Sequence, residues 1–259
     1  MKGREKNSKR TWRPWCLAVV FWSAAAPADT FLILSLVGDR LTIVTPRSQV
    51  GSHLEPGGTD VVPLKDTELD DSAVGSAADT IKKARPAASV TMLRAKDPRL
   101  YKIRDGWVDA DSVDIQELTT LVTTLFSPPV DSHLLLITPY RDNLQLKTDR
   151  SYLGGGSKAA GLGFYVDNYT RMFDTNSLNS GPGFLGTFAN FRLVLINLDN
   201  NAIVAQRRAT VGTTYPAVVA PDKTAWNALS GDKKVASLQW LMKGEMNRLL
   251  PDMLTSAKP

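Results

Sequence analysis

Continuous apolar runs predict the first strands of this chain. Residues 31–37 (Phe-Leu-Ile-Leu-Ser-Leu-Val) and residues 133–138 form such runs, which are typical of strands buried on both faces of a sheet. Gly38 and Asp39 form a turn signal after the first run, and another apolar segment follows at 41–45. This pattern predicts a β-hairpin that covers the first run, the turn and the second segment.

Apolar residues at helical spacing predict two helices on either side of a short strand at 89–93. The first helix covers residues 67–85, where basic residues in the last turn suit the helix dipole and a proline follows. The second helix starts at Asp111 or Ser112 and ends before Pro128. Strands that alternate with helices predict a sheet with helices packed on it.

The pattern changes in residues 140–187, which are rich in Gly, Asn, Asp and Tyr. Short strands are predicted at 144–147 and 161–166, and a long loop is predicted over 169–187. We therefore interpret 140–187 as a Gly/Tyr-rich insertion in the domain.

Regular structure returns after this stretch. Residues 188–198 and 202–211 alternate around an Asp-Asn-Asn turn and predict a hairpin. A short helix is predicted near 224–229 and a long one over 233–253, with Pro251 kinking or ending it. The predicted fold class is α/β: a single-domain sandwich with a mixed sheet of about five to seven strands and about three long helices.

The N-terminal 28 residues have the organisation of a secretory signal. Six basic residues and one acid, Glu5, precede an apolar and small run over residues 16–26. That run is too short to cross a bilayer but suits a signal peptide, and Ala26-Pro27-Ala28 is a small-x-small cleavage site. We predict a Sec-type signal over residues 1–28, cleavage after Ala28, and a periplasmic or secreted protein. The alternative is a leader retained as an anchor.

Removal of this leader changes the charge and the cysteine content. The leader holds six of the 31 basic and one of the 26 acidic residues, so residues 29–259 carry 25 of each. A neutral chain without a basic cluster argues against nucleic acid as a partner. Cys16 is the only cysteine, so its loss excludes disulfides, a thiol nucleophile and thiolate metal sites. No later apolar run is long enough to predict a membrane-spanning helix.

Catalytic motifs are incomplete. Gly38-Asp39-Arg40-Leu41 has an arginine where lipases and esterases of the Gly-Asp-Ser-Leu type have their nucleophilic serine. The chain has only two histidines, His53 and His133, and no G-x-S-x-G elbow. Asp39, His53 and Arg47 remain as candidate catalytic residues of an envelope hydrolase without a recognisable motif.

No metal site or cofactor is predicted. Gly154-Gly155-Gly156-Ser157-Lys158 lacks the spacing of a phosphate-binding loop and suits a hairpin tip. Acids recur at residues 109, 111 and 114, but the segment lacks the glycine and glutamate of an EF-hand, and acids at a helix start also serve its cap.

Aromatic residues crowd the glycine-rich stretch and its surroundings, which predicts a recognition surface if they lie in loops. The alternative is that they form a wall of the core. The predicted surface consists of Phe164, Tyr165, Tyr169, Phe173, Phe184 and Phe188.

Residues 67–138 and the hairpin at 191–206 (Phe-Arg-Leu-Val-Leu-Ile-Asn-Leu-Asp-Asn-Asn-Ala-Ile-Val-Ala-Gln) resemble a periplasmic α/β domain. That domain occurs at the N-terminus of the Tol-system β-propeller protein, in the curli secretion lipoprotein and in lipoprotein activators of penicillin-binding proteins. The chain also resembles uncharacterised exported proteobacterial proteins. The resemblance implies a periplasmic accessory protein, but no functional residue carries over, and the lipid-anchor cysteine is missing.

The sequence therefore favours an exported, non-enzymatic binding or accessory protein with an envelope protein as partner. The alternatives are the envelope hydrolase and a protein that binds a small ligand or a cation. The oligomeric state is open.

Overall fold

The computed structural model describes residues 29–256, apart from 47, 51–52, 56–57, 149–150, 155 and 176, and describes only the backbone of 48–50 and 53–55. The predicted signal peptide lies outside the described residues. None of the described helices is long and apolar enough to span a membrane.

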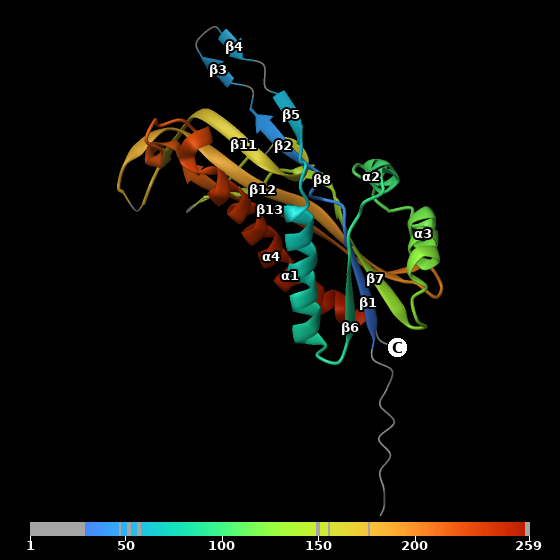
Figure 1. Cartoon of the computed structure of the whole chain (residues 1–259). Coiled ribbons are helices and arrows are strands. Elements are labelled where there is room, and N and C mark those ends of the chain that lie inside the picture. The colour runs from blue at the N-terminus through green and yellow to red at the C-terminus, as the bar shows by residue number, and fades with distance from the viewer. Residues whose placement is uncertain are drawn as a thin grey trace, which may run out of the picture.

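An eleven-stranded mixed sheet organises the protein, and its central strand is β12 (Ser180–Asn197). One edge of β12 pairs with β13 (Ala202–Pro216) from Phe184 to Asn197. Its other edge is shared: the C-terminal half pairs with β7 (Ser132–Pro139) and the N-terminal half with β11 (Lys158–Phe173). The sheet therefore divides into two branches beside β12 (Figure 1).

Each branch continues through a parallel pair, and the second branch ends in the antiparallel pair of β2 and β5. In the first branch, β7 pairs with β1 (Thr30–Ser35), and β1 pairs with β6 (Ser89–Leu93). In the second, β11 pairs with β2 (Arg40–Thr45), and β2 pairs with β5 (Gly58–Pro63). The remaining strands are short: β3 (Ser48–Val50), β4 (His53–Glu55), β8 (Arg141–Asn143), β9 (Leu146–Lys147) and β10 (Tyr152–Leu153).

The predicted hairpin over residues 31–45 is wrong, because β1 and β2 do not pair with each other. The segment between them does not reverse the chain. It carries the chain from one branch of the sheet to the other, so both strands keep the same direction relative to β12.

Helices cover both faces of the first branch. On one face lie α1 (Glu68–Ala84) and α4 (Gly231–Ser256), which contains Pro251 and does not end there. On the other lie α2 (Pro98–Asp105) and α3 (Gln116–Phe126). Short 3₁₀ helices η1 (Ala217–Val219) and η2 (Trp226–Ala228) precede α4.

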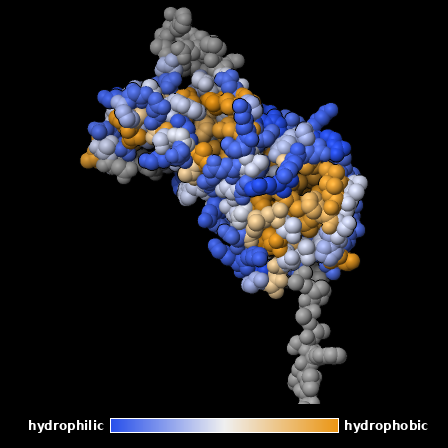
Figure 2. Space-filling view, viewed as in Figure 1, coloured by the Kyte–Doolittle hydropathy of each residue, from blue (hydrophilic) through white to orange (hydrophobic). Residues whose placement is uncertain are grey.

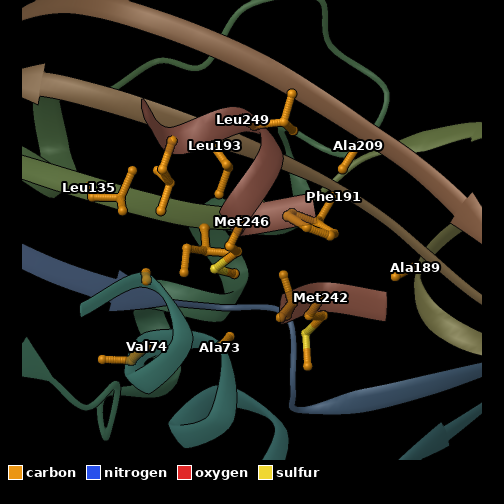
Figure 3. Close-up of a cluster of buried hydrophobic side chains, with 14 of the residues drawn as sticks. Ala73, Val74, Leu135, Ala189, Phe191, Leu193, Ala209, Met242, Met246 and Leu249 are labelled. Carbon is orange, nitrogen blue, oxygen red and sulfur yellow. The ribbon is translucent and has the colours of Figure 1, made fainter. Parts of the chain in front are cut away.

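The largest core cluster lies between α1, α4 and the sheet. Figure 3 shows side chains from both helices meeting those of β7, β12 and β13. Ala73 of α1, Phe191 of β12 and Met246 of α4 are all fully buried. Burial of such side chains is the main source of stability in a protein without a disulfide framework.

The stretch 140–187 contains the short strands β8, β9 and β10, and β9 lies within the strand predicted at 144–147. The long loop predicted over 169–187 is wrong, because β11 continues to Phe173 and β12 begins at Ser180. β11 has 16 residues and β12 has 18. Glycines of β12 and β13 allow close approach within the sheet: a Cβ on Gly186 or Gly212 would lie 2.7 Å from a methyl group of Leu146, which packs over both. A register shift between Asp167 and Arg171 lets the β11–β12 pair bend, and this end of the sheet curls around its own small core.

The structure confirms the α/β class with a mixed sheet in a single domain, although the sheet has more strands than expected. The hairpin predicted from residue 188 onward is also confirmed as β12 and β13. Helix α2 was missed, although its start carries a signal: Pro98 lies in its first turn and the Asp97 side chain accepts a hydrogen bond from the Arg99 N–H.

Candidate functional site

The three candidate catalytic residues are not brought together as a described site. Arg47 lies outside the described residues, as does the side chain of His53. Asp39 directly precedes β2 at the end where Arg40 pairs with Pro63, whereas β3 and β4 extend beyond the opposite end of β2 (Figure 1). The six residues of β2 span about 20 Å, so the backbone places Asp39 and the β3–β4 hairpin far apart.

Asp39 instead belongs to a network of ion pairs at the division of the sheet. Arg104, whose side chain is 1% exposed, donates to the Leu36 carbonyl at 2.8 Å, to both carboxylate oxygens of Asp39, and to Asp105 Oδ1 at 2.7 Å. Arg40 also joins the two acids, with Nε 3.1 Å from Asp39 Oδ2 and Nη2 2.5 Å from Asp105 Oδ1. Two guanidinium groups therefore hold the carboxylate of Asp39.

Asp70 of α1 fixes the adjoining bend between β1 and β2. Its Oδ1 accepts hydrogen bonds from Ser35 Oγ at 2.6 Å and from the N–H groups of Val37 and Gly38 at 3.0 Å each. A Cβ at position 38 would lie 2.6 Å from the Asp70 backbone nitrogen, so the bend requires glycine there. The Tyr101 hydroxyl lies 3.5 Å from Asp70 Oδ2, and burial followed by the Asp70 charge raises the pKa of this phenol.

Burial raises the pKa of the Asp70 carboxyl despite these hydrogen bonds. The stabilisation that Asp70 gives the folded protein therefore decreases as pH rises. A carboxyl whose pKa is raised in the folded state makes its full contribution to the free energy of unfolding below about pH 4. This contribution is lost as pH rises through the raised pKa. Asp70→Asn keeps an oxygen acceptor and removes the titration. We expect the unfolding free energy of the wild type, minus that of Asp70→Asn, to fall from about pH 4 to about pH 7. Urea unfolding at several pH values measures this difference, and a difference that is constant or grows with pH contradicts the assignment.

A cleft of 320 Å³ lies beside the network. Val37, Pro139 and Gly161 contribute to its lining, together with Asp39, Asp105 and their arginine partners. Among the described residues, no serine or histidine lines this cleft as a nucleophile or base for Asp39. We infer that the network holds the bend between the two branches.

The acidic residues near position 111 each bind a different partner. Asp109 pairs with Arg141 at 2.6 Å, Asp111 with Arg208 at 2.8 Å, and Asp114 accepts from the Gln116 N–H at the start of α3. Within the described part of the chain, no group of three or more His, Cys, Asp or Glu residues could hold a metal ion.

His133 is a core histidine at the start of β7. Its ring stacks on Phe31 with centroids 5.5 Å apart, and burial lowers the pKa of the imidazole.

Most of the predicted aromatic surface lies inside the protein. Phe164, Tyr165, Phe184 and Phe188 are at most 7% exposed, so their assignment to an open surface is corrected. They belong to paired strands and not to loops, and Tyr165 stacks on Phe184 at 5.7 Å within the small core of the curled end. The other two members are exposed: Tyr169 by 44% and Phe173 by 52%.

Phe173 lines a groove of 720 Å³ at the curled end of the sheet. We call this cavity the Phe173 groove. Its walls come from the ends of β11 and β13, the β9–β10 turn, η1 and the start of α4. The lining is mixed: seven apolar residues lie beside five serine and threonine residues and Tyr215, and Arg171 and Lys233 add positive charge. The apolar members are Leu153, Met172, Phe173, Pro216, Val219, Ala228 and Leu229.

Sequence reasoning found Phe173 and missed most of the other groove residues. Val219 is 48% exposed on η1, and Lys233 lies in the first turn of α4, so both are distant from Phe173 in sequence. No local motif marks either residue, because the folding of β13 and α4 alone places them there.

The comparisons with known proteins found similar solved structures only. No protein-family model and no curated protein matches the chain. Protein XCC0632 from Xanthomonas campestris, described as family-model DUF330, is 11% identical over 88% of this chain and 84% of its own, with a TM-score of 0.35. Lipoprotein GNA1162 from Neisseria meningitidis is 12% identical over 86% and 99%, with a TM-score of 0.31. A neuraminyllactose-binding hemagglutinin homolog from Helicobacter pylori is 5% identical over 89% and 83%, with a TM-score of 0.34. TM-scores at this level carry no conclusion about the function of this chain.

Proposed function

We propose that this chain is an exported, non-enzymatic binding protein that holds an apolar segment of an envelope protein in the Phe173 groove. The observation that carries the proposal is the half-exposed Phe173 side chain on the wall of a 720 Å³ groove. Ligand sites are commonly concave, mainly apolar and bordered by a few polar groups. Export is proposed from the predicted signal peptide.

The groove is built on paired backbone, which supports recognition without rearrangement. Phe173 pairs with Ser180 across the β11–β12 ladder, and Arg171 Nη2 donates to Ser180 Oγ at 2.9 Å. On the opposite wall, the Ala220 N–H closes the η1 turn onto the Ala217 carbonyl at 2.9 Å, which holds Val219. The backbone that carries these side chains therefore needs no ordering on association, which lowers the entropic cost of binding.

The charge of the groove favours a partner segment that carries an acid. Arg171 and Lys233 line it, and Asp174 is the single acidic residue among its described lining. The Asp174 carboxylate accepts a hydrogen bond from the Ser177 N–H at 2.9 Å, within its own turn. Complementary charge at the rim of an apolar site contributes mainly to orientation and specificity.

The paired substitution Phe173→Asp and Val219→Asp tests the groove. We expect the amount of partner recovered from envelope extracts to fall at least about tenfold, because two carboxylates would have to be desolvated against the apolar segment. The matched control is Leu125→Asp, since Leu125 is 65% exposed on α3 and α3 covers the opposite face. Circular dichroism and thermal unfolding check that all variants fold. Equal recovery by the paired variant and the control, or equal loss in both, contradicts the proposal.

A further inference from the structure

Strand β6 is an open edge of the sheet. Within the described part of the chain, β6 pairs on one side only, with β1. The Ser89 N–H points toward β1 and donates to the Asp29 carbonyl at 2.9 Å. Because backbone groups alternate along a strand, those of Val90 and Met92 point to the outer edge. Met92 is 62% exposed, and Figure 2 shows apolar residues gathered around this side of the molecule.

The open edge of β6 lacks the features that protect other edges from pairing. Charged side chains, proline, bulges and very short strands are the usual protection. β5 has Asp60 and ends at Pro63, and β10 has only two residues. β6 reads Ser-Val-Thr-Met-Leu, with no charge and no proline, and its register with β1 has no irregularity.

We propose that two copies of this chain pair through β6, antiparallel, about a two-fold axis at Thr91. In this register Val90 lies opposite the partner's Met92, and Met92 lies opposite the partner's Val90. These are the residues whose backbone groups point outward, so both form hydrogen-bonded pairs, and Thr91 faces its counterpart in the non-hydrogen-bonded pair between them. The sequence of the strand is thus complementary to itself, as a two-fold interface requires.

The charge distribution of α1 favours a second copy of this chain, over an unrelated strand, as the partner of β6. α1 covers the face of the sheet on which Val90 packs, and it is acidic at its start and basic in its last turn. Two-fold symmetry places the two α1 helices side by side and antiparallel. The acidic first turn of each helix then lies toward the basic last turn of the partner's α1, which is favourable at both ends of the pair, while Asp71 keeps its ion pair with Arg94 and Glu68 its hydrogen bond from Gln239.

Crosslinking tests this register. Thr91→Cys in a Cys16→Ser background brings two thiols together across the axis, where the Cα atoms of a non-hydrogen-bonded pair are about 4.5 Å apart. We expect a disulfide-linked dimer on a non-reducing gel. The matched control is Thr59→Cys, because Thr59 is exposed on the protected edge strand β5. Equal crosslinking of the two variants, or none at Thr91, overturns the proposal.

Sedimentation gives a second readout without an introduced thiol. We expect the unmodified protein to be a dimer and Met92→Lys to be a folded monomer, because Met92 is exposed in the single chain and a charge there disfavours strand addition. A monomeric unmodified protein at the concentration used for crosslinking, or a Met92→Lys dimer, contradicts the two-fold pairing. The Phe173 groove lies on other strands, so this outcome is independent of the proposed function.

Discussion

Arg104→Ala is expected to lower the free energy of unfolding by about 3–5 kcal/mol, the usual effect of removing one partner from a buried ion pair. The side chain is almost fully buried and contacts the Leu36 carbonyl, Asp39 and Asp105. Its removal leaves the carboxylate of Asp39, which burial already penalises, with Arg40 alone. Because Asp39 and Asp105 are partly exposed, we expect the lower end of this range.

The control for this experiment is Arg94→Ala. Arg94 makes a two-pronged ion pair with Asp71, at 2.8 and 2.7 Å, but both side chains are exposed. Exposed pairs of this kind contribute about 0–1 kcal/mol. Urea unfolding of the two variants compares them directly. If Arg104→Ala costs no more than Arg94→Ala, the network does not hold the bend between the two branches of the sheet.

Gly163→Ala is expected to cost about 3 kcal/mol, at the upper end of the usual range for overpacking. Gly163 lies in β11 between β2 and β12, where a Cβ would lie 1.8 Å from the Thr42 carbonyl oxygen and 2.7 Å from Cζ of Phe188. The closest atom belongs to the backbone of a paired strand, so it cannot move as the end of a side chain could. Relief requires β2 to shift away from β11.

Gly75→Ala, in contrast, is expected to raise the free energy of unfolding slightly. Gly75 lies within α1, and a Cβ there meets nothing within 4 Å. Alanine in a helix is more favourable than glycine by about 0.5–1 kcal/mol, so this variant should be slightly more stable than the wild type. Thermal or urea unfolding of the two variants gives changes of opposite sign. Similar changes would show that β11 and β2 do not approach as closely as the structure places them.

The elements with local signals could be predicted from the sequence. The apolar runs at β1 and β7, the periodicity of α1 and the turn between β12 and β13 each depend on residues close in sequence. The path between β1 and β2 could not be predicted in this way. A Gly-Asp pair after a strand is typical of a hairpin, and the chain bends here instead because Asp70 and Arg104, far along the chain, hold residues 35–39.

The site residues in the glycine-rich stretch also depend on contacts that are distant in sequence. Glycine usually indicates a loop, but Gly163 and Gly186 serve close packing inside paired strands. Their aromatic neighbours Phe164 and Phe188 are therefore core residues. Phe173 stays exposed because it lies beyond the register shift in β11, where the hairpin bends away from its core. That shift has no signature in composition, so the sequence alone could not separate buried aromatics from exposed ones.

The groove as a binding site can be tested directly by site-specific photocrosslinking in the intact envelope. The photoreactive residue p-benzoylphenylalanine replaces Phe173 in one sample and Leu125 in another, since both positions are exposed and lie on different faces. We predict a discrete protein adduct from position 173 and none of the same mass from position 125. The same adducts from both positions, or no adduct from position 173, would contradict the account of this chain as a protein that binds a partner in the Phe173 groove.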